Sequence, residues 1–427
     1  MRILIFLLSL LITISAFGQE TNGTEKDSVS GIKKTIADFS EKKGHPFTTG
    51  YLPVGFFDID LKTLFKYNIH EGLRLGIGGV TNEKLFENYN LGGYVAYGFK
   101  DQTFKYSLGG SALLNKEKKA WVSLYYVDDI KEIGTYDFLT DARFYSLFEP
   151  RLLNIIQFYK YTKWQANIQS ELSPKILTEL RVQHSDVGNF EEYYFINDGR
   201  GYNEYQLAEA ILAFRVKLRT DSIVNSDGKK VATDVLPKVS AQITKGFKGI
   251  AGSDFNYAKF GLKLDYDIER KNLSRTSFLL QGVLANGDVP LTHLFHAFPN
   301  QPTKERLFNR FSVAGVQSFE TMYFGEFYSD KLAMFQLKHT FRRFKLAKNW
   351  KPELVLLSRH AIGEMSNPED HFGISFNQLD HFYNEAGFEL NKIALGFGLS
   401  FAYRYGFYNL PDLEDNISFK FTFNLKL

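Results

Sequence analysis

The last twelve residues, "NISFKFTFNLKL" (416–427), constrain the fold more than any other stretch of the chain. Apolar residues occupy every second position, and polar residues separate them. A period of two predicts a β-strand with one apolar face and one polar face. The apolar face consists of Ile417, Phe419, Phe421, Phe423, Leu425 and Leu427.

Segments of the same kind recur along the chain, and each has the length of a membrane-spanning strand. Residues 72–80, 90–99 and 103–114 are examples, and a tilted strand needs about 9–11 residues to cross a bilayer. After the first twenty residues, no stretch approaches the roughly 20 consecutive apolar residues of a spanning helix. The sequence therefore argues against a helical membrane protein and favours a membrane sheet.

Single-chain bacterial barrels have an even number of antiparallel strands, with short periplasmic turns and longer outer loops. Because backbone groups must be paired in hydrocarbon, we expect the sheet to close, with the last strand paired to the first. The sequence thus predicts an all-β fold, a closed antiparallel transmembrane β-barrel of about 16 strands (14–18). The predicted strands are 58–68, 72–80, 90–99, 103–114, 120–128, 160–171, 175–184, 206–218, 238–246, 257–268, 275–286, 331–341, 352–359, 382–390, 393–405 and 416–427, and 317–327 is left over.

The start of the chain predicts export. Met1-Arg2 gives a positive charge, an apolar stretch follows, and Ala16-Phe17-Gly18 has the small residues of a cleavage site. We expect a signal peptide (1–18), a short periplasmic segment (19–50) and a barrel (51–427) in the outer membrane of a Gram-negative bacterium. The long outer loops would be 129–159, 185–205, 287–330 and 360–381.

Composition and motifs give little indication of a metal or cofactor site. Without cysteine there are no disulfides and no thiolate metal ligands, and a net charge of +3 does not suggest nucleic acid as a partner. His293, His296 and His371 lie in predicted outer loops, but a metal site needs three or four ligands held by further partners. We expect no metal and no cofactor.

A serine hydrolase in the barrel wall is the enzymatic alternative. His184 and Ser185 are adjacent, so a strand would point them to opposite faces. No Gly-x-Ser-x-Gly elbow is present. We therefore expect a protein that is not an enzyme, and an outer-membrane lipase is the less favoured alternative.

Three stretches carry a family resemblance. They are "GYLPVGFFDIDLKTLFKYNIHEGLRLGIGGVTNE" (50–83), "YVAYGFKDQTFKYSLGG" (94–110) and "FYSDKLAMFQLKHTF" (327–341). They resemble the BamA/TamA-type barrels of the surface-antigen superfamily, and within it the barrels that usually follow a carboxypeptidase-regulatory-like domain. The resemblance covers roughly residues 45–427.

The resemblance implies a barrel involved in passage, insertion or display of macromolecules at the outer membrane. It implies outer-membrane lipid and lipopolysaccharide as surroundings, and assembly machinery that reads the C-terminal strand. A polypeptide client is a further candidate partner. A diffusion pore for small polar solutes is the alternative function, because an open barrel with a polar interior would conduct.

The chain departs from this superfamily in two places. Periplasmic POTRA domains precede BamA-type barrels, whereas only the segment 19–50 precedes this one. The superfamily also carries an Arg-Gly-Phe/Tyr motif on its sixth outer loop, where 287–330 has Asn309-Arg310-Phe311. We expect Arg310 and Phe311 to plug the lumen, with Arg310 close to carboxylates of the inner wall.

Overall fold

The chain divides into two compact units, Met1–Thr49 and Gly50–Leu427, and a computed structural model describes most of the second. The described residues are 50–141, 150–153, 155–189, 192–218, 222–224, 230–232, 237–270, 274–301, 313–315, 317–345, 351–394 and 397–423. The predicted signal peptide and nearly all of segment 19–50 lie outside them. So do Arg310, Phe311, Leu425 and Leu427.

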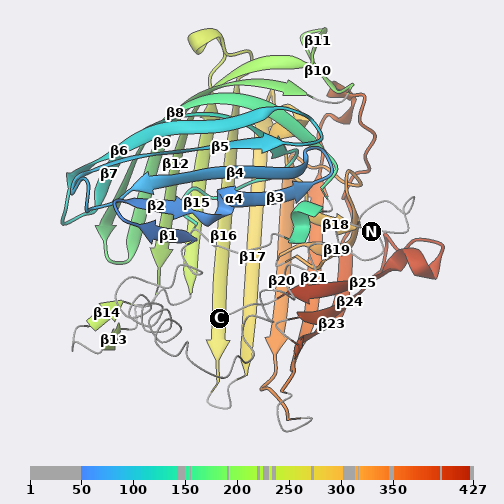
Figure 1. Cartoon of the computed structure of the whole chain (residues 1–427). Helices are drawn as coiled ribbons and strands as arrows, with labels where there is room; N and C mark the ends of the chain where they lie inside the picture. The colour runs from blue at the N-terminus through green and yellow to red at the C-terminus, as the bar shows by residue number, and fades with distance from the viewer. Residues whose placement is uncertain are drawn as a thin grey trace. The chain divides into compact units, whose positions relative to one another are not determined.

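One large antiparallel sheet of 18 strands forms the second unit (Figure 1). Its long strands pair with their neighbours in chain order, so hairpin follows hairpin along the sheet. The strands are β1 (Tyr51–Val54), β2 (Phe57–Asp60), β3 (Phe65–Asn68), β4 (Gly72–Thr81), β5 (Tyr89–Gly98), β6 (Phe104–Asn115), β7 (Ala120–Glu132), β8 (Phe158–Ser173), β9 (Ile176–Asn189), β12 (Glu204–Lys217), β15 (Lys238–Gly246), β16 (Tyr257–Glu269), β17 (Arg275–Gly287), β20 (Lys331–Thr340), β21 (Glu353–Glu364), β23 (Tyr383–Ala394), β24 (Phe397–Tyr405) and β25 (Ile417–Phe423).

Small elements lie in the connections between these strands. β10 (Tyr194–Asn197), β11 (Arg200–Tyr202) and β22 (His371–Phe372) form a three-stranded sheet. β13 (Ser222–Val224) pairs with β14 (Lys230–Ala232), and β18 (Pro299–Gln301) runs parallel to β19 (Phe319–Tyr323). Among the described residues, no helix is long and apolar enough to cross a membrane. The 3₁₀ turns are η1 (Pro150–Leu153), η2 (Ile250–Gly252), η3 (Leu291–His293), η5 (Pro368–Asp370) and η6 (Leu413–Asn416).

The first predicted strand, 58–68, is interrupted. β2 and β3 both pair with β4, and one helical turn, α4 (Leu61–Leu64), separates them. Asp60 caps this turn, because its carboxylate accepts the Lys62 N–H at 3.0 Å. The apolar residues Leu61, Leu64 and Phe65 follow a helical spacing here, which the prediction of a continuous strand overlooked.

The other predicted strands match observed ones, with shifted ends. β7 continues to Glu132 and β9 to Asn189, so the predicted outer loops 129–159 and 185–205 are shorter than expected. When β2 and β3 are counted as one pass and the short β1 is set aside, the sheet of 18 strands has sixteen passes. The leftover segment 317–327 contains β19, which is not part of the large sheet.

The expected pairing of the last strand with the first is not seen. Among the described residues, β25 pairs with β24 and with none of β1, β2 or β3. Its other edge meets the loop 288–330, where Val313 forms a parallel bridge with Phe421 and the Ala314 N–H donates to the Phe421 carbonyl at 2.8 Å. The large antiparallel sheet is therefore shown, and its closure into a barrel is not.

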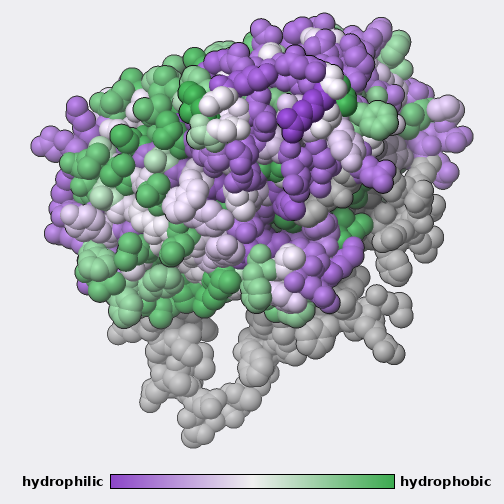
Figure 2. Space-filling view, turned by 90° about the horizontal axis from the view of Figure 1, so that it is seen from above, coloured by the Kyte–Doolittle hydropathy of each residue, from purple (hydrophilic) through white to green (hydrophobic). Residues whose placement is uncertain are grey.

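The two faces of the sheet differ as the alternation predicts. In β25, Ser418, Lys420 and Thr422 are buried, whereas Phe419 is 55% and Phe421 38% exposed. We call the face that bears the buried set the inner face and the opposite one the outer face. Exposed apolar side chains also occur on earlier strands, and Figure 2 shows apolar residues gathered along one side of the molecule. Soluble proteins rarely expose so much contiguous apolar surface.

The outer face yields a prediction about the solvent that it meets. Leu108 in β6 is 71% exposed and Leu413 in η6 is 65% exposed. If the outer face lies in lipid, Leu108→Arg should destabilise the protein folded into vesicles by about 2–4 kcal/mol, since it places a charge near the bilayer midplane. Leu413→Arg, the matched control in a loop, should change it little. Equal effects in urea titrations would contradict a lipid-facing outer face.

Candidate functional site at the inner face of the last strands

Connections from distant parts of the chain pack together into one buried apolar cluster. It includes residues of the connections after β7, β9, β15, β17 and β21 together with inward residues of the strands beside them. Edge-to-face ring contacts join these segments, such as Tyr136–Phe295 with centroids 5.4 Å apart and Phe195–Phe255 at 5.1 Å. We call this set the loop cluster. Its fully buried aromatic residues include Tyr193, Phe255, Tyr257, Phe295, Tyr328 and Tyr383.

The loop 288–330 connects this cluster to the last strands of the sheet. β19 contacts β23, β24 and β25, and Phe319 packs edge-to-face on Tyr383 with centroids 5.5 Å apart. The Thr321 N–H donates to a Glu385 carboxylate oxygen at 2.8 Å, and the Thr321 hydroxyl donates to the same oxygen at 2.8 Å. This loop therefore lies on the inner face of the sheet.

Ion pairs between the loop and the strands hold this arrangement. The Lys420 ammonium of β25 donates to Glu320 of β19 at 2.9 Å, and both side chains are almost fully buried. Arg404 of β24 donates to Glu326 at 2.7 Å. Three further hydrogen bonds anchor the Glu320 carboxylate: Ser318 and Asn300 donate to it at 2.7 Å, and the Gly315 N–H donates at 3.0 Å. Buried charges are stable only when paired and hydrogen-bonded in this way.

The described ion pairs of this loop involve other residues than the predicted arginine, whose contacts stay a prediction. The sequence predicts an arginine of this loop close to carboxylates of the wall. In the described part of the loop, Glu320 and Glu326 supply the carboxylates, and the strands supply Lys420 and Arg404. The predicted plug residues, Arg310 and Phe311, lie outside the described residues.

A second ionic cluster connects the loop 288–330 to the end of β7, far along the sheet from β25. Glu132 at the end of β7 accepts from Arg151 of η1 at 2.6 Å and contacts the His296 ring nitrogen at 2.9 Å. Arg151 also donates to the Pro299 carbonyl at 3.0 Å. One carboxylate thus joins two connections that are far apart in the sequence.

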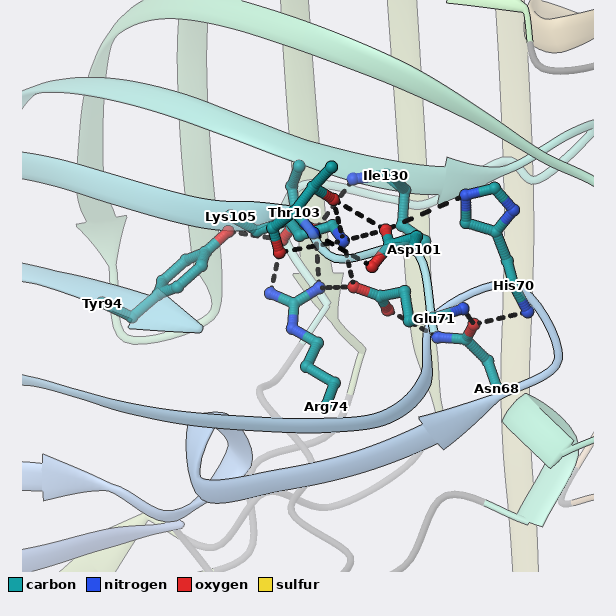
Figure 3. A network of polar contacts seen from close by, with 10 residues as sticks. Asn68, His70, Glu71, Arg74, Tyr94, Asp101, Thr103, Lys105 and Ile130 are labelled. Atoms are coloured by element: carbon teal, nitrogen blue, oxygen red, sulfur yellow. Dashed lines mark hydrogen bonds and ion pairs between the residues drawn. The ribbon is translucent and has the colours of Figure 1, made fainter. Parts of the chain in front are cut away.

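A third network joins the hairpins at the start of the sheet (Figure 3). Arg74 of β4 forms a two-point contact with Asp129 of β7, at 2.6 and 3.0 Å, and Tyr94 of β5 donates to the same carboxylate at 2.5 Å. Glu71 lies 3.3 Å from Arg74 and 3.1 Å from Lys105, and Lys105 also pairs with Asp101. The sequence did not reveal this network, because its members are isolated charges on separate strands.

The three loop histidines have separate partners. His293 contacts the Thr292 hydroxyl at 2.8 Å, His296 contacts Glu132, and His371 contacts the Tyr193 hydroxyl at 2.9 Å. Burial lowers the pKa of His371 to about 4 and that of His293 to about 3, so both are neutral at pH 7. Within the described residues, no group of three or more metal-ligating side chains occurs.

His184 and Ser185, the adjacent residues weighed for the lipase alternative, have different surroundings. Ser185 is buried on the inner face, while the His184 ring contacts the Ala251 carbonyl at 2.9 Å. Neither side chain has a hydrogen bond to the other among the described contacts. In the part of the chain that the structure describes, the inner face of the sheet instead carries loop segments held by buried ion pairs.

The Lys420–Glu320 pair yields a prediction about loop docking. Lys420→Met should lower the free energy of unfolding by about 3–5 kcal/mol, because it leaves the Glu320 carboxylate buried without its cation. Adding Glu320→Gln should restore part of the loss, since the uncompensated charge is then removed. The exposed pair Lys116–Glu87 supplies the control, and Lys116→Met should have little effect. Urea unfolding would measure all three, and a double variant no more stable than Lys420→Met would contradict the docking role.

Two solved structures are similar in fold to this chain. The fold is similar to that of the crystal structure of BamA from Haemophilus ducreyi lacking POTRA domains 1–3, with a TM-score of 0.52 and 13% identity over 92% of this chain and 78% of that chain. A looser likeness is to CdiB from Acinetobacter baumannii, with a TM-score of 0.40 and 11% identity over 83% of this chain and 56% of that one. The first likeness shows a BamA-like fold, and the second is too weak to carry an argument.

No match was found among curated proteins. Residues 56–322, more than half of the chain, match the C-terminal domain of a family of unknown function, DUF5686. The matched region begins one residue before β2 and includes the strands of the large sheet up to β17. The chain therefore belongs to the DUF5686 family.

Proposed function

We propose that this chain is an integral outer-membrane protein with a BamA-like barrel, and that it passes, inserts or displays macromolecules rather than catalysing a reaction. The observation that carries the proposal is the packing of the loop 288–330 on the inner face, together with the loop cluster. A protein that only surrounds a water-filled channel has no need of a buried apolar cluster in its interior.

This packing also separates the proposal from its main alternative. A diffusion pore for small polar solutes needs a continuous polar channel, as porins have. Here aromatic residues such as Phe295, Phe319 and Tyr328 are buried inside the sheet, and the charges beside them are neutralised in pairs. A steady open pore is therefore the second candidate.

The membrane part of the proposal rests on the outer face. In β25 the exposed residues Phe419 and Phe421 alternate with buried polar ones. We propose that this face, with Ile417, Phe423, Leu425 and Leu427, meets lipid and lipopolysaccharide. An outer-membrane location, a signal peptide over 1–18 and delivery by assembly machinery that reads the last strand belong to the same proposal.

The proposal that the protein handles a macromolecule is based on the edge of β25. A strand edge can accept an extended polypeptide by adding it as a further strand. Here Ala314 of the loop meets this edge at Phe421, so a client strand would have to replace that contact. A polypeptide client is therefore our proposed partner, and the loop would control access to the edge.

Conductance tests the proposal directly. The parent protein in planar bilayers should show no steady open state, because the loop cluster and the described residues of the loop 288–330 pack on the inner face. Deleting 302–328, which removes β19 with Glu320 and Glu326, should produce large and frequent openings. Deleting 222–232, the separate hairpin of β13 and β14, is the control and should leave the parent behaviour unchanged. A parent protein with a steady open state would favour the diffusion pore.

A further inference from the structure

A small cavity lies between the inner face and the loop 288–330. Gln281 of β17, Gln336 of β20 and Arg359 of β21 line it from the sheet, and Phe298, Gln317 and Phe319 line it from the loop. The three strand residues come from adjacent strands, since β20 pairs with both β17 and β21, and Gln336 lies directly opposite Arg359. Leu279, Met334 and Phe335 of these strands also line the cavity. The polar wall formed by Gln281, Gln336 and Arg359 is thus bordered by apolar side chains and faces aromatic rings of the loop.

The polar wall carries hydrogen-bond donors that lack acceptors. Arg359 is 1%, Gln281 4% and Gln336 7% exposed. The side-chain Nε2 of each glutamine and both Nε and Nη2 of Arg359 are buried without a hydrogen-bond partner. Leaving a buried donor unsatisfied costs about 1–3 kcal/mol, and more for a charged group, so four in one cavity call for an acceptor.

The free atoms of Arg359 form a complete binding edge. Its Nη1 donates to Glu385 at 2.6 Å, which fixes one side of the guanidinium. Nε and Nη2 are the two parallel donors of the opposite side, and this fork matches the two oxygens of a carboxylate. The two glutamine amides add single donors from neighbouring strands. Water would satisfy such donors one at a time, whereas a planar anion would satisfy the fork as a unit.

We propose that this cavity binds a small planar oxyanion of the carboxylate class, with Arg359 contacting two oxygens and Gln281 and Gln336 donating to the same group. The assignment goes beyond the proposed function, since it concerns a ligand of the cavity and not a client at the edge of β25, but both rest on the packing of the described loop residues on the inner face. Glu385 already partly neutralises Arg359, and Glu320 lies close enough to interact with it. The affinity should therefore be weak, in the millimolar range.

Thermal unfolding of the full chain in detergent micelles tests the proposal. Sodium formate would replace sodium chloride at constant ionic strength, so that general screening stays the same. The unfolding midpoint of the parent should rise with formate and then saturate, as expected for one site that binds only the folded state. Gln336→Met and Gln281→Met should each weaken the apparent formate affinity by about fivefold, the loss of one hydrogen bond.

Gln317→Met is the matched control, because Gln317 lines the same cavity from the loop, is exposed and has no unpartnered buried donor. It should keep the parent response. Arg359→Lys should abolish the response, and the two glutamine variants keep the test decisive if that variant fails to fold. A parent midpoint that does not distinguish formate from chloride would overturn the proposal and leave water or a halide in the cavity. An equal response in parent and glutamine variants would also overturn it.

Discussion

A β-sheet has to satisfy the hydrogen-bonding groups of its two edge strands, and in the proposed membrane location this constraint would be strict, because hydrocarbon offers no partners. A closed barrel meets it by joining the edges. Here β25 is joined to β24 on one side, and on the other it meets residues 313–314 of the loop 288–330. The loop therefore serves two purposes at once, since it contacts the last edge and occupies the inner face.

The inner face can hold this loop because polar residues alternate with the apolar ones that face outward. Lys420, Arg404 and Glu385 are inward residues of β25, β24 and β23, and each pairs with a group of the loop. The apolar loop cluster then excludes water around these pairs, which strengthens them and makes each unpaired charge costly. The exposed apolar outer face, the buried ion pairs and the loop packing thus follow from the same two-residue period.

The sequence allowed the strands to be predicted because their signal is local. Period two and short polar turns are visible within ten residues, so all the long strands were located. The helical turn at Leu61–Leu64 and short strands such as β1 and β10 were missed. Long-range partners have no such signal. The pairing of Glu320 with Lys420 joins residues 100 positions apart, and the contact of Ala314 with Phe421 depends on where the loop turns back. Closure was inferred from membrane physics, and the loop that meets the edge was not foreseen.

The position of the last edge can be measured directly, because the chain has no cysteine. Cysteine pairs at Val313 and Phe421, and at Tyr67 and Phe421, would be introduced separately and oxidised in isolated outer membranes. A disulfide requires Cα atoms within about 4.4–6.8 Å, so it reports which segment lies beside β25. The account predicts a disulfide between positions 313 and 421 and none between 67 and 421. A disulfide from 421 to 67, or to 65 in a shifted register, without one to 313 would show that the first strand lies beside β25. That result would contradict the position of the loop at this edge.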